Sequence, residues 1–295
     1  MAEASGMRKL AGAGLATAGA AVALLLLGAG SSGAAASDGA GHALIGEARR
    51  GSVTVRIAPA VDVVVSGARA AGRPIVVIDP GHGGRDPGAV SVSGAVAEKQ
   101  LTLALARELR DRLVERGRVR VALTRDSDRY LTLEERAGVA RGLGASLFLS
   151  LHMDSAPNPL ARGASVYSLS DVASDAEAAR FAAAENAGGG VGIADGSVRS
   201  MLSDLALRSL MTASADLASR LVRKSAARVE MRPEPHRFAT FHVLRRAQAP
   251  AVLFEAGYVS NAEDELLLRS PGHRAALVAG LAETIEADVA ARSRR

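Results

Sequence analysis

From residue 74 onward, the hydrophobic positions follow two patterns in turn: short apolar runs typical of buried strands and the spacing of an amphipathic helix. Apolar runs of strand length occur at 75–78, 118–124 and 146–151. Between the first two runs, leucines recur every fourth residue from Leu101 to Leu113, which is the spacing of a helix with one apolar face. Because strands and helices take turns along the chain, we expect an α/β fold in which a twisted, mainly parallel mixed sheet is flanked by helices.

The same pattern predicts the remaining elements. Helices are expected at 97–115, 132–141, 174–186, 198–210, 212–228 and 273–291, and further strands at 166–169, 241–244 and 250–254. Ser174 with Glu177, and Ser260 with Glu263, have the spacing of a capping box, which predicts a helix start at each serine.

The N-terminus has the pattern of an export signal. Arg8 and Lys9 precede an uncharged stretch that ends near Gly30, and small residues surround Ala36 as they do at a cleavage site. We therefore expect residues 1–36 to be a signal peptide that directs the chain to the periplasm or cell envelope. A membrane would be a partner only if this segment were retained as an anchor. Residues 37–73 are interpreted as a linker or a vestigial N-terminal segment.

Composition narrows the possible chemistry. The 295 residues carry a net charge of +5, and none of them is cysteine. Without thiols, zinc fingers and thiol catalysis are excluded, so a metal would have to be held by histidine and carboxylate side chains. A basic chain suits an anionic polymer, but no run of arginine marks a nucleic-acid surface, and we expect no nucleic acid as a partner.

Candidate ligands follow the predicted strands. His82 lies in a glycine-rich loop after the first strand, while His152 and Glu255 end two later strands. Since the carboxyl ends of strands form the sites of open α/β sheets, these side chains are expected to gather there. Glu98 begins the helix that follows the His82 loop. Two imidazoles and a carboxylate form a ligand set for zinc, and a second carboxylate could take the proton of a metal-activated water.

Four motifs in this order resemble the zinc-dependent N-acetylmuramoyl-L-alanine amidases of the amidase-3 type, which are cell-wall hydrolases. They are DPGHGGRDPGA from Asp79, EK from Glu98, SLH from Ser150 and EAGYVSN from Glu255. The resemblance implies that His82, Glu98 and His152 bind Zn²⁺, and that Glu255 is the catalytic carboxylate. It also implies that residues 74–291 are a catalytic domain acting on peptidoglycan. The bond cleaved would join N-acetylmuramic acid to the L-alanine of the stem peptide.

Residues 172–211 exceed the short connection that a minimal amidase of this type needs, and we interpret them as a helical insertion. Resemblance to the cell-division branch implies a role in daughter-cell separation. It also implies an inhibitory helix whose glutamate occupies the open zinc position until a protein activator displaces it. Glu185 resembles that glutamate, with a solvated helix charge as the alternative. An apolar face could dock the activator or pack on the domain. It consists of Met201, Leu202, Leu205, Leu210 and Met211.

Two residues and two other functions stay open at this point. Arg125 is expected either to orient substrate or to pair with a carboxylate, and Asp79 to support the ligands or form the turn. A zinc peptidase or carboxypeptidase could use the same ligands on another bond of the wall peptide. A catalytically inactive wall-binding regulator would keep the fold without the activity.

Overall fold

A computed structural model describes residues 61–67, 72–187 and 200–294, without the side chains of residues 200–203. The expected signal peptide lies outside the described residues, as does most of the expected linker. Among the helices that are described, none combines the length and the apolar character needed to cross a membrane.

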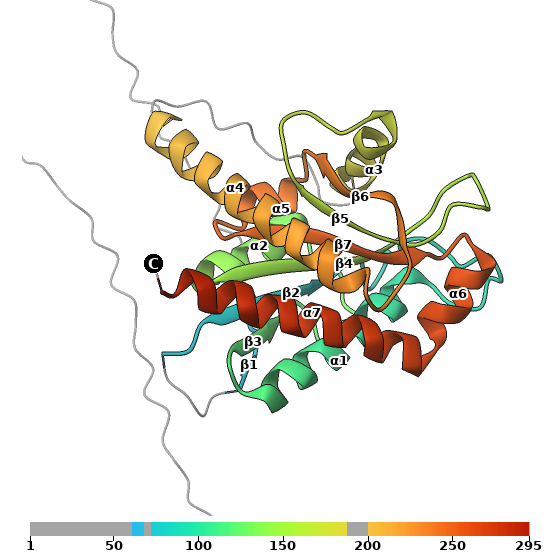
Figure 1. Ribbon diagram of the computed structural model, residues 1–295, viewed down its shortest axis with the longest axis horizontal. Coiled ribbons are helices and arrows are strands. Elements are labelled where there is room, and N and C mark those ends of the chain that lie inside the picture. The colour runs from blue at the N-terminus through green and yellow to red at the C-terminus, as the bar shows by residue number, and fades with distance from the viewer. Residues whose placement is uncertain (1–60, 68–71, 188–199, 295) are drawn as a thin grey trace, which may run out of the picture. The chain divides into compact units, whose positions relative to one another are not determined.

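A mixed sheet forms the centre of the described domain (Figure 1). Its strands follow the order β1-β3-β2-β4-β7-β5-β6. β1 pairs antiparallel with β3 and β5 with β7, while the other four pairings are parallel, so the predicted mainly parallel mixed sheet is confirmed. The strands are β1 (Val65–Ser66), β2 (Ile75–Pro80), β3 (Arg120–Leu123), β4 (Leu147–Asp154), β5 (Ala164–Leu169), β6 (Met231–Ala239) and β7 (Ala251–Tyr258).

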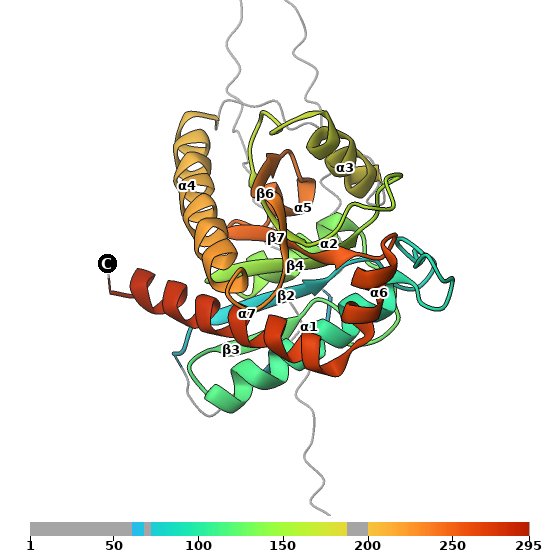
Figure 2. The ribbon, with the colours of Figure 1, turned by 45° about the vertical axis from the view of Figure 1, so that its right-hand side comes forward.

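Helices cover both faces of this sheet (Figures 1 and 2). One face packs against α1 (Glu98–Arg116), α4 (Ser200–Ser225) and α7 (Pro271–Arg292). The other face packs against α2 (Leu133–Gly142), α3 (Ala176–Ala187) and α5 (His242–Arg246). The short helix α6 (Ala262–Arg269) follows β7. The predicted leucine stripe of α1 is confirmed, since Leu105, Leu109 and Leu113 are fully buried against the sheet.

Two element predictions are wrong, and one strand was not predicted. The two helices expected at 198–210 and 212–228 are one helix, α4, because no glycine or proline interrupts residues 200–225. The strand expected at 241–244 is instead part of α5, since a short apolar run does not distinguish strand from helix. The edge strand β6 was not predicted, because Pro233 and Pro235 lie within it. Proline is tolerated there because an edge strand leaves one row of backbone groups unpaired.

Both predicted capping positions, Ser174 and Ser260, are wrong by one residue. α3 begins after Asp175, whose Oδ1 accepts a hydrogen bond of 2.9 Å from the backbone of Ala178. α6 begins after Asn261, whose Oδ1 accepts from two backbone amides of the first turn. Ser174 and Ser260 accept hydrogen bonds from other parts of the chain. The acidic and amide side chains therefore cap in place of the neighbouring hydroxyls.

The segment 172–211 contains α3 and the first turns of α4. Its glycine-rich stretch, 188–192, lies outside the described residues. Ala178 and Ala182 of α3 are buried against the sheet, so this helix lies on the α2–α5 face. The interpretation of the segment as an insertion stays a prediction.

Candidate active site

Parallel strand ends bring the predicted site residues together. His152 on β4 lies directly opposite Glu255 on β7, and His82 follows two residues after the end of β2, the neighbour of β4 on its other side. The rings of His82 and His152 meet edge to face, with their centroids 4.9 Å apart. Both histidines therefore lie at the carboxyl edge of the sheet, as the sequence predicted.

Glu98 lies between the two rings. Its Oε1 is 3.0 Å from Nε2 of His82 and 3.1 Å from Nδ1 of His152. Backbone amides fix the carboxylate from behind, since Met153 donates to Oε1 at 3.0 Å and Ala89 donates to Oε2 at 2.9 Å. The first turn of α1 thus delivers a buried, oriented carboxylate to the histidine pair.

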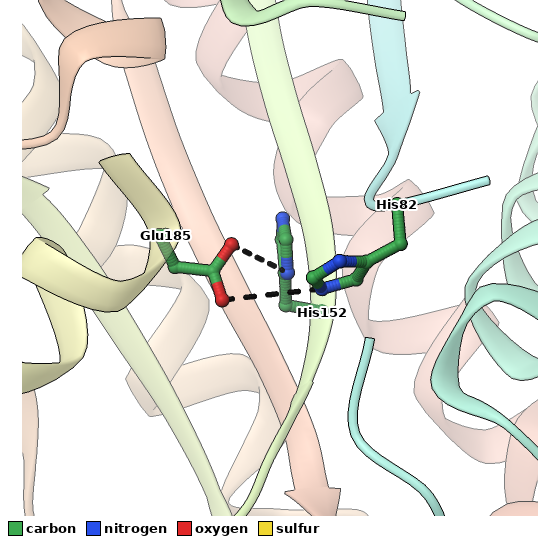
Figure 3. A group of neighbouring side chains, drawn as sticks. All are labelled: His82, His152 and Glu185. Atoms are coloured by element: carbon green, nitrogen blue, oxygen red, sulfur yellow. Dashed lines mark ion pairs between the residues drawn. The ribbon is translucent and has the colours of Figure 1, made fainter. Parts of the chain in front are cut away.

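Glu185, near the end of α3, points toward the same two nitrogens (Figure 3). Its Oε1 lies 3.9 Å from Nε2 of His82, and its Oε2 lies 3.4 Å from Nδ1 of His152. Ligand atoms of these three residues all lie within 4.8 Å of one another. Ligands of tetrahedral zinc, at bond lengths of about 2.0–2.2 Å, are roughly 3.4 Å apart. Two imidazoles with Glu98 or Glu185 therefore fit the ion by type and by spacing.

Electrostatics at the cluster favour a cation. Burial opposes a charge on His82, but the neighbouring carboxylates of Asp86, Glu98 and Glu185 outweigh it and raise the pKa of His82 to about 10. Burial raises the pKa of Glu185, which the charged histidines only partly offset. Within the described residues, Nε2 of His82 has no aligned hydrogen-bond partner. A metal ion between the rings would satisfy these groups together.

His82 is oriented by its other nitrogen. Its Nδ1 lies 3.0 Å from Oδ2 of Asp86, four residues along the same loop. This contact leaves Nε2 facing Glu98 and Glu185. A carboxylate behind a histidine fixes the ring and makes it a better metal ligand.

Glu255 is fully buried, and neither of its carboxylate oxygens has a hydrogen-bond partner in the described part of the chain. Burial raises the pKa of this carboxyl well above its ordinary value, and the nearby carboxylates of Asp154, Glu98 and Glu185 raise it further. A carboxylate in this environment has a strong tendency to accept a proton. That is the property needed in a general base next to a metal site.

A buried network supports the His82 loop. Asp79 accepts hydrogen bonds from Arg136 at 2.8 Å and from Ser150 at 3.0 Å. Burial would raise the pKa of Asp79, but the charge of Arg136 and the hydrogen bonds from Thr124 and Arg136 hold it below its ordinary value. Arg136 also donates to the carbonyl oxygen of His82 at 2.6 Å. Arg136, for which no role was predicted, thus connects the buried strand to the candidate ligand.

Arg125 is buried under the same loop. It donates from Nη2 to the carbonyl oxygen of Gly81 at 2.7 Å and from Nε to that of Pro80 at 3.0 Å. Its other hydrogen bonds within the described residues go to the backbone carbonyls of Ser127 and Lys99 and to the hydroxyl of Thr102, rather than to a carboxylate. These contacts are those of a residue that holds the loop.

Two glycines permit the close packing of the site. A Cβ on Gly81 would lie 2.3 Å from Cε1 of His152, and one on Gly88 would lie 2.5 Å from Oε2 of Glu98. Gly88 also has a φ of +66°, which side chains disfavour. The glycines of the motif therefore leave room for the candidate ligands themselves.

An α/β domain that gathers two histidines and several buried carboxylates at the carboxyl edge of its sheet is a candidate metal-dependent hydrolase. Residues 76–287 match the family N-acetylmuramoyl-L-alanine amidase (Amidase_3), and the chain belongs to this family.

Known proteins agree with this assignment. N-acetylmuramoyl-L-alanine amidase AmiA of Escherichia coli is 33% identical over 223 residues, which cover 74% of this chain and 76% of that protein. AmiC of Neisseria meningitidis is 31% identical, and the match covers 72% of this chain and 52% of that protein. The solved catalytic domain of CwlV, from Bacillus (Paenibacillus) polymyxa, is 27% identical with a TM-score of 0.54, covering 72% of this chain and 96% of the other.

The family gives the chain its activity. The protein is an N-acetylmuramoyl-L-alanine amidase, and its substrate is peptidoglycan. The family is zinc-dependent in general, which agrees with the histidine and carboxylate cluster. Of the alternatives left open by the sequence, neither the peptidase nor the inactive regulator is supported.

Proposed function

We propose that this amidase is an exported zinc enzyme of the cell envelope that acts in daughter-cell separation and is inhibited at rest by its own helix α3. In this proposal His82, Glu98 and His152 hold Zn²⁺, Glu255 is the catalytic carboxylate, and Glu185 occupies the remaining position at the metal. The observation that carries the proposal is the carboxylate of Glu185, directed at both histidines from a helix outside the strand-end motifs.

In the proposed reaction, the metal and the side chains of the protein have different roles. Zinc held there would polarise the scissile carbonyl and lower the pKa of a water molecule toward about 7. Glu255 accepts the proton of the attacking water, for which its buried, unpaired carboxylate is suited. The same carboxyl then gives the proton to the nitrogen of the departing alanine. Asp86 holds His82 in place during both steps.

Inhibition follows from what Glu185 excludes. Its carboxylate oxygens lie 3.9 Å from Nε2 of His82 and 3.4 Å from Nδ1 of His152, so they occupy space at the candidate ligands that a substrate carbonyl would need. α3 is fastened near this point, since Asn186 donates to the carbonyl oxygen of Thr240 at 2.7 Å and accepts from the backbone of His242 at 2.8 Å. A protein activator would have to break these contacts.

The apolar face predicted on the segment is divided. Met211 packs against the sheet and Leu210 is half-buried, whereas Leu205 is 67% exposed. The side chains of Met201 and Leu202 lie outside the described residues. Leu205 is therefore the most exposed of the described residues of this face, and we assign it to contact with an activator.

Zinc dependence is tested on the purified protein. We expect one equivalent of zinc, loss of hydrolysis after chelation, and recovery when zinc is returned. Substitution Glu255→Gln removes the base and nearly preserves shape, so it should lower kcat by about 100- to 10,000-fold while zinc content stays unchanged. An active Glu255→Gln enzyme would overturn the assigned role, and loss of zinc in that variant would show a ligand instead.

Inhibition is tested by Glu185→Ala. We expect basal hydrolysis of purified peptidoglycan to rise, with release of stem peptides that carry a free N-terminal alanine. Glu115→Ala, on the exposed surface of α1, removes a glutamate far from this helix and serves as the matched control. Equal basal rates in the two variants would contradict the blocking role.

A further inference from the structure

Two arginines on β6 lie under helix α3 and bind its acidic residues. Nη1 and Nη2 of Arg232 donate to the two carboxylate oxygens of Glu177, each at 3.1 Å. Nη2 of Arg237 lies 2.6 Å from both oxygens of Asp175. The side chain of Arg237 is 4% exposed and that of Arg232 is 14% exposed. The N-terminal end of α3 therefore covers a pair of nearly buried guanidinium groups.

These arginines lie beside the catalytic edge of the sheet. Glu255 on β7 is opposite Ser165 on β5, and Tyr167 on β5 is opposite Arg237 on β6. Because side chains of a strand alternate between faces, Glu255, Ser165, Tyr167 and Arg237 all lie on the face that α3 covers. Arg232 reaches the same region, since its Nη1 donates to the hydroxyl of Tyr258, three residues after Glu255, at 2.6 Å.

Several polar atoms on this surface have no partner. Within the described part of the chain, Nε of Arg232 and Nε of Arg237 are buried without a hydrogen bond, and so are the hydroxyls of Ser165 and Tyr167. Buried polar groups without partners are rare, so these four atoms call for an explanation, and a bound ligand would supply one. Ser165 and Tyr167 lie on β5, between Glu255 on β7 and the arginines on β6.

A surface cleft of about 650 Å³ adjoins Arg232. Arg162, Arg180, Arg232 and Tyr258 line it, together with the loop around Asn158. Glu177 and Glu230 also line it and pair with Arg232 and Arg162, so Arg232 becomes available to an acidic chain once its contact with Glu177 is broken.

We propose that Arg232 and Arg237 bind carboxylates of the stem peptide, and that Glu177 and Asp175 occupy their place at rest. This inference rests on the proposed blocking role of α3. Stem peptides carry free carboxylates beyond their first alanine, and a guanidinium fork pairs with a carboxylate through two hydrogen bonds. The helix thus imitates an acidic peptide at the arginines in addition to filling the metal position with Glu185.

The test compares the two partners of one ion pair in a Glu185→Ala background. Arg232→Gln and Glu177→Gln both break the contact with α3, but only the first removes the group proposed to bind substrate. Soluble muramoyl peptides serve as substrates, with the α-carboxyl of the second residue either free or amidated. We expect Arg232→Gln to raise KM about 10- to 100-fold for the free acid and to leave KM for the amide unchanged. Glu177→Gln should raise KM for neither substrate.

Two outcomes overturn the inference. If Arg232→Gln and Glu177→Gln have the same KM for the free acid, Arg232 acts only as a contact for the helix. If Arg232→Gln raises KM equally for both substrates, it does not recognise that carboxylate. Arg232→Lys keeps the charge and should recover part of the affinity, whereas a folding defect would lower the melting temperature of all Arg232 variants together.

The proposed blocking role of Glu185 is tested by a separate measurement, the basal activity of Glu185→Ala. If Glu185→Ala does not raise basal activity, the role of Glu185 is refuted. The comparison of free and amidated substrates can still be made in the wild-type background, where it reports on Arg232 alone.

Discussion

Docking of α3 depends on one aromatic side chain, and its removal should activate the enzyme. Phe181 lies between Tyr167 and Phe241, with ring centroids 5.1 and 5.7 Å away. The helix face beside it contributes only alanines to the core, Ala178 and Ala182. Phe181→Ala therefore removes the largest apolar contact of α3 while leaving Glu185 in place.

The magnitude follows from burial. A fully buried phenylalanine costs about 3–5 kcal/mol when truncated to alanine, so partly buried Phe181 should contribute roughly 2 kcal/mol to docking. A difference of about 2 kcal/mol changes the docked-to-undocked ratio about 30-fold. If nearly all molecules are docked at rest and, as proposed, only the undocked state admits substrate, basal hydrolysis should rise by a similar factor.

Release of soluble peptides from purified peptidoglycan measures the rate, and hydrogen exchange of the α3 amides measures docking. Val172→Ala is the matched control, since Val172 precedes α3 but is 76% exposed. We expect faster exchange and faster hydrolysis in Phe181→Ala only. Faster exchange of α3 without faster hydrolysis would refute the reasoning, because the helix would then be loose and yet not inhibitory.

Further predictions concern the support of the metal site. Asp79→Ala leaves Arg136 buried without its carboxylate and should lower the free energy of unfolding by about 3–5 kcal/mol, measured in urea; a loss under 1 kcal/mol would refute it. Because the folded pKa of Asp79 is below its ordinary value of 3.8, its stabilisation is present above about pH 4 and lost as pH falls through the folded pKa. As pH falls, the free energy of unfolding of Asp79→Ala should accordingly decrease less steeply than that of the wild-type protein. Gly81→Ala should displace the ring of His152 and weaken zinc binding about 10- to 100-fold in chelator competition. Gly142→Ala, whose Cβ would meet nothing within 4 Å, should leave zinc binding unchanged.

The positions of His82, His152 and Glu255 could be predicted because each follows an apolar strand. Parallel strands end at one edge, so their order along the chain was enough to place these residues together. Glu98 followed from its place in the first turn of α1, close to the His82 loop. These positions could be predicted because the local backbone geometry of a strand end or of the first turn of a helix determines where the side chain lies.

Other features depend on contacts between distant segments. The strand β6 has two prolines and becomes a strand only because β5 offers it a parallel edge. Arg136 lies 57 residues from Asp79, and no periodicity relates them. The ion pairs of Arg232 and Arg237 form only when α3 packs over β6, so the sequence of either element alone does not indicate them. Such pairings are set by tertiary packing, so a pattern read along one segment could not reveal them.

The acidic residues of α3 also bear on how activation would proceed. Lifting the helix would break the ion pairs that Arg232 and Arg237 make with Glu177 and Asp175, which costs free energy. Substrate carboxylates would replace Glu177 and Asp175 and offset that cost, so substrate and activator would favour the same undocked state. Reciprocity of binding free energies then requires that each raises the affinity for the other. An activator should therefore bind more tightly when an acidic stem peptide is present, and Arg232→Gln should weaken that coupling.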